Sequence, residues 1–107
     1  MTVKLPPLAE AEFQRQVIDL AHILGWRVAH FRPAMTAHGW RTPVQADGKG
    51  FPDLVMVRRD RLIFAELKAE KRKLTPEQVE WFNALTAVAE VYVWHPADIE
   101  ALASTLR

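Results

Sequence analysis

Glu66 and Lys68 stand two residues apart at the end of the apolar run 62–67, and another acid, Asp53, opens the apolar run before it. Side chains alternate along a strand, so Glu66 and Lys68 would share one face. Burying either charge is costly unless it is paired or bound to a metal. Antiparallel pairing of the two runs would bring Asp53 close to Glu66. A hard cation such as Mg²⁺ or Mn²⁺ would then relieve the repulsion between the carboxylates and keep waters for a phosphate substrate.

These residue types fit metal-assisted hydrolysis of a phosphodiester bond. A cation on Asp53 and Glu66 would polarise the scissile phosphate, generate hydroxide from a bound water and stabilise the charge that grows on the phosphate oxygens. Lys68 would orient or help deprotonate that water, or neutralise the transition state. A structural explanation is also open, in which Glu66 and Lys68 form an ion pair and Asp53 accepts hydrogen bonds in a turn after Pro52.

The first half of the scaffold is indicated by hydrophobic spacing and by glycine. Apolar residues at helical spacing predict a helix over residues 8–24, which Gly25 ends, and alternation predicts a strand over 26–31. Residues 32–50 contain two prolines, three glycines and no apolar periodicity. We therefore expect one long loop there, and loops of that length are usually functional or mobile.

The second half begins with the two apolar runs, 54–57 and 62–67, which are separated by a charged turn and indicate a hairpin. Thr75, Pro76 and Gln78 form the start of a capped helix. Its apolar stripe is expected to be Val79, Phe82 and Leu85. A strand at 91–94 and a helix at 96–106 close the chain, with Ile99, Leu102 and Leu106 facing inward. The fold class is therefore α/β, with a mixed central sheet flanked by helices.

Length and composition favour a single packed domain over residues 1–107. Half of the residues are apolar and a quarter are charged. The absence of cysteine excludes disulfides, thiolate zinc sites and a cysteine nucleophile. No apolar run has the length of a membrane span, and the first residues lack the apolar core of a signal peptide, so we expect a cytoplasmic protein with no membrane partner.

Charge is unevenly distributed along the chain. Eleven of the fourteen basic residues lie between Arg27 and Lys73, where the net charge is +6, and the rest of the chain carries −5. This pattern suggests a middle segment that faces a polyanion, although solvated loops would explain it equally well.

Several short motifs, taken together and in order, resemble one nuclease family. They are Gly50-Phe51-Pro52-Asp53-Leu54, Glu66-Leu67-Lys68 and Leu74-Thr75-Pro76-Glu77-Gln78, preceded by Glu10-Ala11-Glu12-Phe13-Gln14. The combination closely resembles the virus-type replication-repair nuclease (VRR-NUC) domain of the PD-(D/E)xK superfamily, and it runs from about Glu10 to Trp94. The resemblance implies a restriction-endonuclease-like αβββαβ core. It also implies a Mg²⁺-dependent nuclease that cuts branched DNA as a homodimer, in a family whose small members are often phage-encoded.

The resemblance also implies roles for individual residues. Asp53, Glu66 and the main-chain carbonyl of Leu67 would hold the metal, and Lys68 matches the catalytic lysine. Glu10 matches a first-helix glutamate that reaches the active site, with Glu12 as the alternative. Acids in a first helical turn also simply favour the helix dipole. Gln78 matches a second-helix glutamine, but its capping role would turn the same side chain back to Thr75.

Basic loop residues near the proposed site are candidates for contacts with DNA phosphates, which add affinity without reading sequence. They are Arg41, Lys49, Lys71, Arg72 and Lys73. Trp40 could stack on an unpaired base, although packing on its own domain is commoner. The four histidines show no zinc spacing, but the strand of His30 could bring it near Asp53.

Three functions remain open from sequence: a nuclease, a DNA-binding module with a degenerate site, and a structural or protein-interaction domain. A junction resolvase and a flap or nicking endonuclease would share the same chemistry. Symmetrical cleavage of a four-way junction needs two active sites, which favours a C₂ homodimer. Trp81, Trp94 and the apolar face of the last helix are candidates for its interface.

Overall fold

A four-stranded mixed sheet organises the chain, with the strands in the order β1-β4-β5-β6. The structure is a computed structural model that describes residues 10–31, 34–36, 39–41 and 44–107, with side chains left undescribed between 32 and 43. Strands β1 (Arg27–His30), β4 (Leu54–Arg58) and β5 (Arg61–Leu67) pair antiparallel, and β6 (Glu90–Trp94) joins β5 in parallel. The expected α/β class with a mixed central sheet is confirmed.

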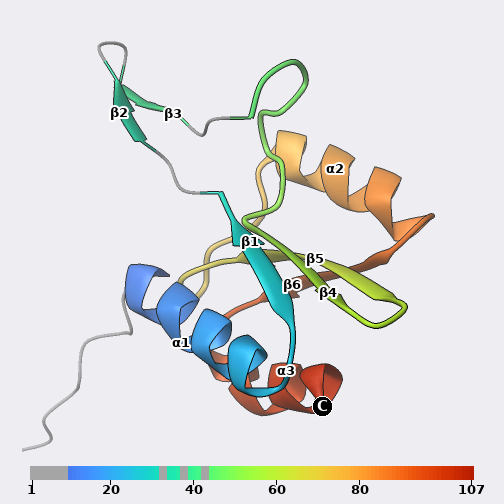
Figure 1. The fold of residues 1–107 in the computed structure, drawn as a ribbon. Helices are drawn as coiled ribbons and strands as arrows, with labels where there is room; N and C mark the ends of the chain where they lie inside the picture. The colour runs from blue at the N-terminus through green and yellow to red at the C-terminus, as the bar shows by residue number, and fades with distance from the viewer. Residues whose placement is uncertain (1–9, 32–33, 37–38, 42–43) are drawn as a thin grey trace, which may run out of the picture.

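Helices cover both faces of this sheet (Figure 1). Helices α1 (Glu10–Ile23) and α3 (Ile99–Leu106) lie on one face, and α2 (Pro76–Thr86) lies on the other. A short 3₁₀ turn, η1 (Pro96–Asp98), leads into α3. The main elements follow the expected αβββαβ order. None of the helices in the described residues is long and apolar enough to cross a membrane.

The hydrophobic core lies between the sheet and the pair α1 and α3. Alternate residues of β4 and β5 point into it, and they meet one stripe of each helix. The largest fully buried side chains are those of Phe13, Val17, Leu54, Met56, Ile63, Leu67, Leu102 and Leu106. Burying one such side chain stabilises the fold by about 1.5–3 kcal/mol. The core therefore holds β4 and β5 in place, and the candidate site residues Asp53, Glu66 and Lys68 lie at the ends of these two strands.

Two expectations about the C-terminal part of the chain are wrong. Ile99 is 39% exposed at the first residue of α3, and Leu102 and Leu106, further along the helix, fill the core. Trp94 is 4% exposed and stacks on Tyr92, with 5.2 Å between ring centroids. Because Trp94, Leu102 and Leu106 are buried within this chain, their side chains are not available for a dimer interface.

The expectation of one continuous loop over residues 32–50 is also wrong. Strands β2 (Ala34–Thr36) and β3 (Gly39–Arg41) pair antiparallel as a separate two-stranded sheet, which projects away from the main sheet (Figure 1). Each strand has three residues, too few for the alternation that identifies a strand in sequence. The remainder, residues 44–50, forms turns and no strand.

Candidate active site

Asp53 and Glu66 lie side by side where β4 begins and β5 ends. The register pairs Leu54 with Ala65, so the next residues outward, Asp53 and Glu66, face each other across the two strands. Both the side chain and the main chain of Asp53 accept hydrogen bonds. Its Oδ2 accepts from the main-chain N–H of Leu67 at 3.0 Å, and its carbonyl accepts from the N–H of Phe31 at 2.9 Å. The predicted convergence of the two acids is thus present in the structure.

The surroundings of this pair disfavour two negative charges. Burial, followed by the neighbouring charge of Asp53, raises the pKa of Glu66 to about 9. Burial also raises the pKa of Asp53, although the Leu67 N–H and the charges of His30 and Lys68 oppose that rise. The Oε2 atom of Glu66 is buried and accepts no hydrogen bond from the described residues. A proton held by the pair, or a divalent cation in its place, would relieve both the repulsion and this missing contact.

Lys68 completes the group from the same face of β5. It is 8% exposed, and its main-chain N–H continues the sheet by donating to the carbonyl of Trp94 at 2.9 Å. Its positive charge opposes the rise in the pKa values of Asp53 and Glu66. No salt bridge joins Lys68 to a carboxylate in the described part of the chain. The explanation of Glu66 and Lys68 as a direct ion pair therefore lacks its contact.

Gln78 performs both of the roles that the sequence left as alternatives. Its Oε1 accepts from the Thr75 N–H at 2.9 Å while the Thr75 hydroxyl accepts from the Gln78 N–H, which completes the capping box of α2. Its Nε2 donates to Glu66 Oε1 at 2.9 Å. The cap thus fixes which end of the amide faces Glu66. Helix α2 thereby supplies a hydrogen-bond donor to Glu66 Oε1.

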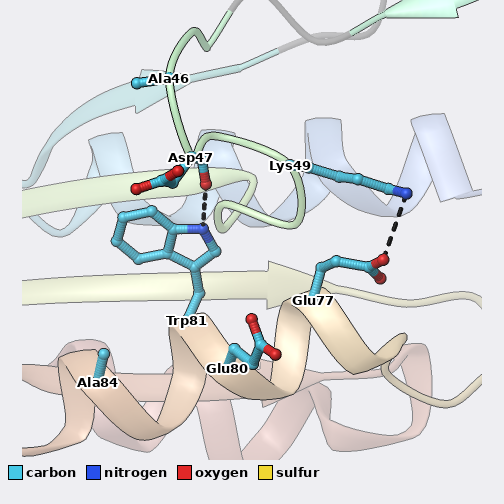
Figure 2. Close-up of a pocket in the computed structure, with 7 residues that line it drawn as sticks. All are labelled: Ala46, Asp47, Lys49, Glu77, Glu80, Trp81 and Ala84. Carbon is cyan, nitrogen blue, oxygen red and sulfur yellow. Dashed lines mark hydrogen bonds and ion pairs between the residues drawn. The ribbon is translucent and has the colours of Figure 1, made fainter.

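An aromatic cluster anchors the segment that carries Asp53. The ring of Phe51 makes edge-to-face contacts with Phe31, Phe64 and Trp81, at centroid distances of 5.4, 5.9 and 5.0 Å. Trp81 also donates its indole N–H to the carbonyl of Asp47 at 2.9 Å, so α2 is tied to the loop before β4 (Figure 2). These rings come from four separate segments of the chain, and only the aromatic content of the sequence hints at such a cluster.

Gly50 brings the same loop into close contact with α2. Its φ is +85°, and a Cβ atom there would lie 2.6 Å from the carbonyl carbon of Glu77 and 2.8 Å from the nitrogen of Gln78. Only glycine fits a contact this close in this backbone conformation. Gly50 therefore places the Asp53 segment directly against the turn of α2 that carries Gln78.

Within the described residues, no hydrogen bond or salt bridge joins Glu10, the predicted outer acid of α1, to Asp53, Glu66 or Lys68. Glu10 is half-buried at the first residue of α1. Glu12 is exposed and forms an ion pair with Arg15 at 3.6 Å on the outer side of the helix. This difference favours Glu10 over Glu12 as the outer residue. His30 lies in β1 opposite Leu54, and its charge reaches Asp53, as its strand suggested.

The basic residues predicted to contact DNA phosphates lie in different surroundings. Lys49 is bound to Glu77 at 3.3 Å beside a hollow of about 520 Å³ that three acids line (Figure 2). An acidic hollow is a poor phosphate site, so Lys49 is better explained as an ion-pair partner. The exposed residues Lys71, Arg72 and Lys73 follow β5 closely after Lys68. The side chains of Trp40 and Arg41 lie outside the described residues.

A metal at this site would have few protein ligands. The described residues contain no group of three or more His, Asp or Glu side chains suited to a metal ion. The N–H and C=O of a strand residue point to the same side, so the Leu67 carbonyl faces Asp53 as the Leu67 N–H does. Two carboxylates and one carbonyl suit Mg²⁺, which keeps several waters and binds substrate phosphates directly. The residues present therefore fit such an ion.

Comparisons with known proteins add no relative: no protein-family model, curated protein or solved structure matches this chain. Its function must therefore be inferred from the chemistry of Asp53, Glu66, Lys68 and Gln78.

Proposed function

We propose that this chain is a Mg²⁺- or Mn²⁺-dependent endodeoxyribonuclease of the PD-(D/E)xK type. The observation that supports this most strongly is the pairing of half-buried Asp53 with buried Glu66 beside buried Lys68, which raises the pKa of Glu66 to about 9. Two facing carboxyls in such surroundings need a shared proton or a cation, because two negative charges removed from water repel each other. A divalent cation would meet this need, and groups with strongly shifted pKa values cluster at catalytic sites.

The residues divide the reaction between them. Asp53, Glu66 and the Leu67 carbonyl would hold the ion, which supplies an activated water and stabilises charge on the phosphate. Gln78 holds Glu66 in a fixed rotamer through its Nε2. Lys68 is close enough to influence both carboxylates and would orient the water or neutralise the growing negative charge. The exposed residues Lys71, Arg72 and Lys73 would contact backbone phosphates of the DNA strand that is cut.

The finer assignment follows the motif order. We place the chain in the VRR-NUC branch, acting on branched DNA of the junction or flap kind. A homodimer would provide the two active sites that paired incision needs. A bacterial cytoplasm, with a phage as a possible source of the gene, is the setting that fits this assignment.

The test is cleavage of labelled linear duplex, single-stranded, flap and four-way-junction DNA with Mg²⁺, Mn²⁺ or EDTA. Wild type, Asp53→Ala and Lys68→Ala are compared, and Arg15→Gln serves as a surface control. We expect metal-dependent cutting by wild type and by the control, and at least a hundredfold loss in each site variant, as for other groups that stabilise developing charge. Salt-sensitive binding without cutting under any metal would instead identify a DNA-binding module with an inactive site.

A further inference from the structure

A second cationic feature lies at the far end of β4 from Asp53. Here a hollow of about 640 Å³ is lined by the guanidinium-bearing residues Arg27, Arg58, Arg59 and Arg107, and no acidic side chain lines it. Its lining residues come from the connection that leads from α1 into β1, from the end of β4 and its turn, and from the residue that follows α3. The hollow shares no residue with the nuclease site, so its charges need an explanation of their own.

One of these arginines has a structural role. Arg58 donates from Nη1 to the carbonyls of Leu24 and Leu106, at 3.0 and 2.7 Å, and from Nη2 to the carbonyl of Arg107 at 3.0 Å. Its guanidinium also lies 4.7 Å from the ring centroid of Trp26. Arg58 therefore offsets the negative C-terminal ends of α1 and α3, each equivalent to about half a charge. This leaves the other arginines without that explanation.

Arg27 and Arg59 are exposed and make no ion pair within the described residues. Two acids, Glu90 and Asp60, do not change this. Glu90 is bound to Arg61 at 2.7 Å, and Asp60 adjoins Arg59 in the turn without a salt bridge. The rim of the hollow therefore keeps a surplus of positive charge that can bind an anion.

The backbone at Arg59 adds a second observation. Its φ is +56°, in the left-handed region that glycine and asparagine occupy easily and that costs other residues about 1–2 kcal/mol. Such strain tends to occur at functional positions, and here it falls on an arginine of the turn that lines the hollow.

We propose that this hollow binds a backbone phosphate of DNA and forms a second contact remote from the Asp53–Glu66 site. The five residues of β4 span about 17 Å at roughly 3.4 Å per residue. That length matches about five base pairs at 3.4 Å per pair, so the hollow and the metal site lie within the length of a short duplex arm. The contact would fix where an arm lies relative to the metal site. This choice of ligand rests on the proposed function, although binding at the hollow needs no metal.

The test measures DNA binding in EDTA, where no cutting occurs. A short fluorescein-labelled duplex is titrated over a range of salt concentrations with wild type, Arg27→Gln, Arg59→Gln and the matched control Arg15→Gln. All three variants lose one positive charge, and Arg15 is an exposed residue of α1 away from the hollow. Arg58 is left intact because its loss would destabilise the helix ends. Circular dichroism melting verifies that each variant is folded.

We expect Arg27→Gln and Arg59→Gln each to weaken binding roughly fivefold to tenfold at low salt and to lower the salt slope by about 1. Arg15→Gln should stay within about twofold of wild type. Equal affinities for all four proteins, or equal losses in all three variants, would overturn the proposal, and so would a failure of wild type to bind. Cleavage with Mg²⁺ is scored separately. If wild type cuts DNA and the arginine variants bind as wild type does, the DNA contact at the hollow is rejected and the nuclease proposal stands. If binding depends on the arginines but no protein cuts, the nuclease proposal is rejected and the contact at the hollow stands.

Discussion

At the scale of single residues, the carboxyl of Glu66 links the stability of the fold to pH. Glu66 is buried, and in the metal-free chain its pKa of about 9 keeps it protonated at neutral pH. An unfolded chain would release that proton above the ordinary value of 4.5. The contribution of Glu66 to stability is therefore fully present below pH 4.5 and is lost as the pH rises towards 9.

Glu66→Gln should therefore stabilise the metal-free protein at alkaline pH. The amide keeps the shape of the protonated acid and its acceptor for Gln78, and it cannot ionise. We expect equal melting temperatures near pH 4 and a variant more stable by at least about 4 °C at pH 9, where about 1 kcal/mol corresponds to that shift.

Thermal melting in EDTA across this pH range measures the difference. Adding Mn²⁺ at pH 8 supplies the matched control, because ligand binding should raise the melting temperature of wild type and have little effect on the variant. A wild type whose stability rises from pH 5 to 9 relative to the variant would contradict the assigned direction of the pKa shift.

At the scale of elements, the start of α2 combines stability with site geometry in one side chain. Thr75 serves only the cap, whereas Gln78 serves the cap and Glu66 together. Thr75→Val should cost about 1 kcal/mol of stability and leave metal affinity nearly unchanged. Gln78→Leu should cost a similar amount and also weaken Mn²⁺ binding about tenfold or more, as removal of a partner of a metal ligand does.

Denaturant melts and Mn²⁺ titration calorimetry on the two variants separate these effects. Equal losses of metal affinity in Thr75→Val and Gln78→Leu would mean that α2 acts only through its stability. That result would remove Gln78 from the site.

Two glycines with the same backbone conformation provide a second element-scale test. Gly50 and Gly25 have φ values of +85° and +87°, but a Cβ at Gly25 would meet only one atom, at an ordinary distance of 3.7 Å. Gly25→Ala should therefore cost only the backbone strain, about 1–2 kcal/mol. Gly50→Ala should add about 1–3 kcal/mol from overpacking and should displace Asp53.

Denaturant unfolding and Mn²⁺ titration of both alanine variants are the measurements. Metal affinity should fall in Gly50→Ala and persist in Gly25→Ala. Equal stability losses with intact metal binding in both would show that the contact of Gly50 with α2 does not position Asp53.

The sequence predicted those elements whose signals are local. The hairpin of β4 and β5, the cap at Thr75 and the end of α1 at Gly25 each depend on neighbouring residues, and all were confirmed. The pairing of Asp53 with Glu66 followed from the hairpin register. The Phe51 cluster could not be predicted, because its rings meet only after distant elements pack. The strands β2 and β3 were missed because three residues carry no period.

At the scale of the whole molecule, the positive middle segment separates into regions with different roles. Lys71, Arg72 and Lys73 follow the metal-site strand, whereas Arg27, Arg58 and Arg59 surround the hollow at the other end of β4. Charge that appeared as one block in sequence is therefore divided between two ends of one sheet. A single DNA arm in contact with both ends would explain why the remainder of the chain can be acidic.

The homodimer remains a prediction, and the exposed apolar residues at α2 direct its test. Helix α2 has no buried residue, and Val79 within it and Val88 just after it are 40% and 79% exposed. With Trp94, Leu102 and Leu106 buried in the chain's own core, helix α2 and the half-buried Trp81 remain the candidates for the interface. Val88→Glu should then weaken self-association about tenfold or more, since it places a charge at an apolar contact.

Ile23→Glu is the matched control, because Ile23 is also 79% exposed but ends α1 on the opposite face of the sheet. Sedimentation equilibrium on wild type and both variants measures the dissociation constant, and junction cleavage is followed in parallel. We expect Val88→Glu to shift the protein towards monomer and to replace paired incisions by single nicks, because one chain has one site. Ile23→Glu should self-associate like wild type. A monomeric wild type that still cuts both strands together would rule out the dimer and require one site to act twice.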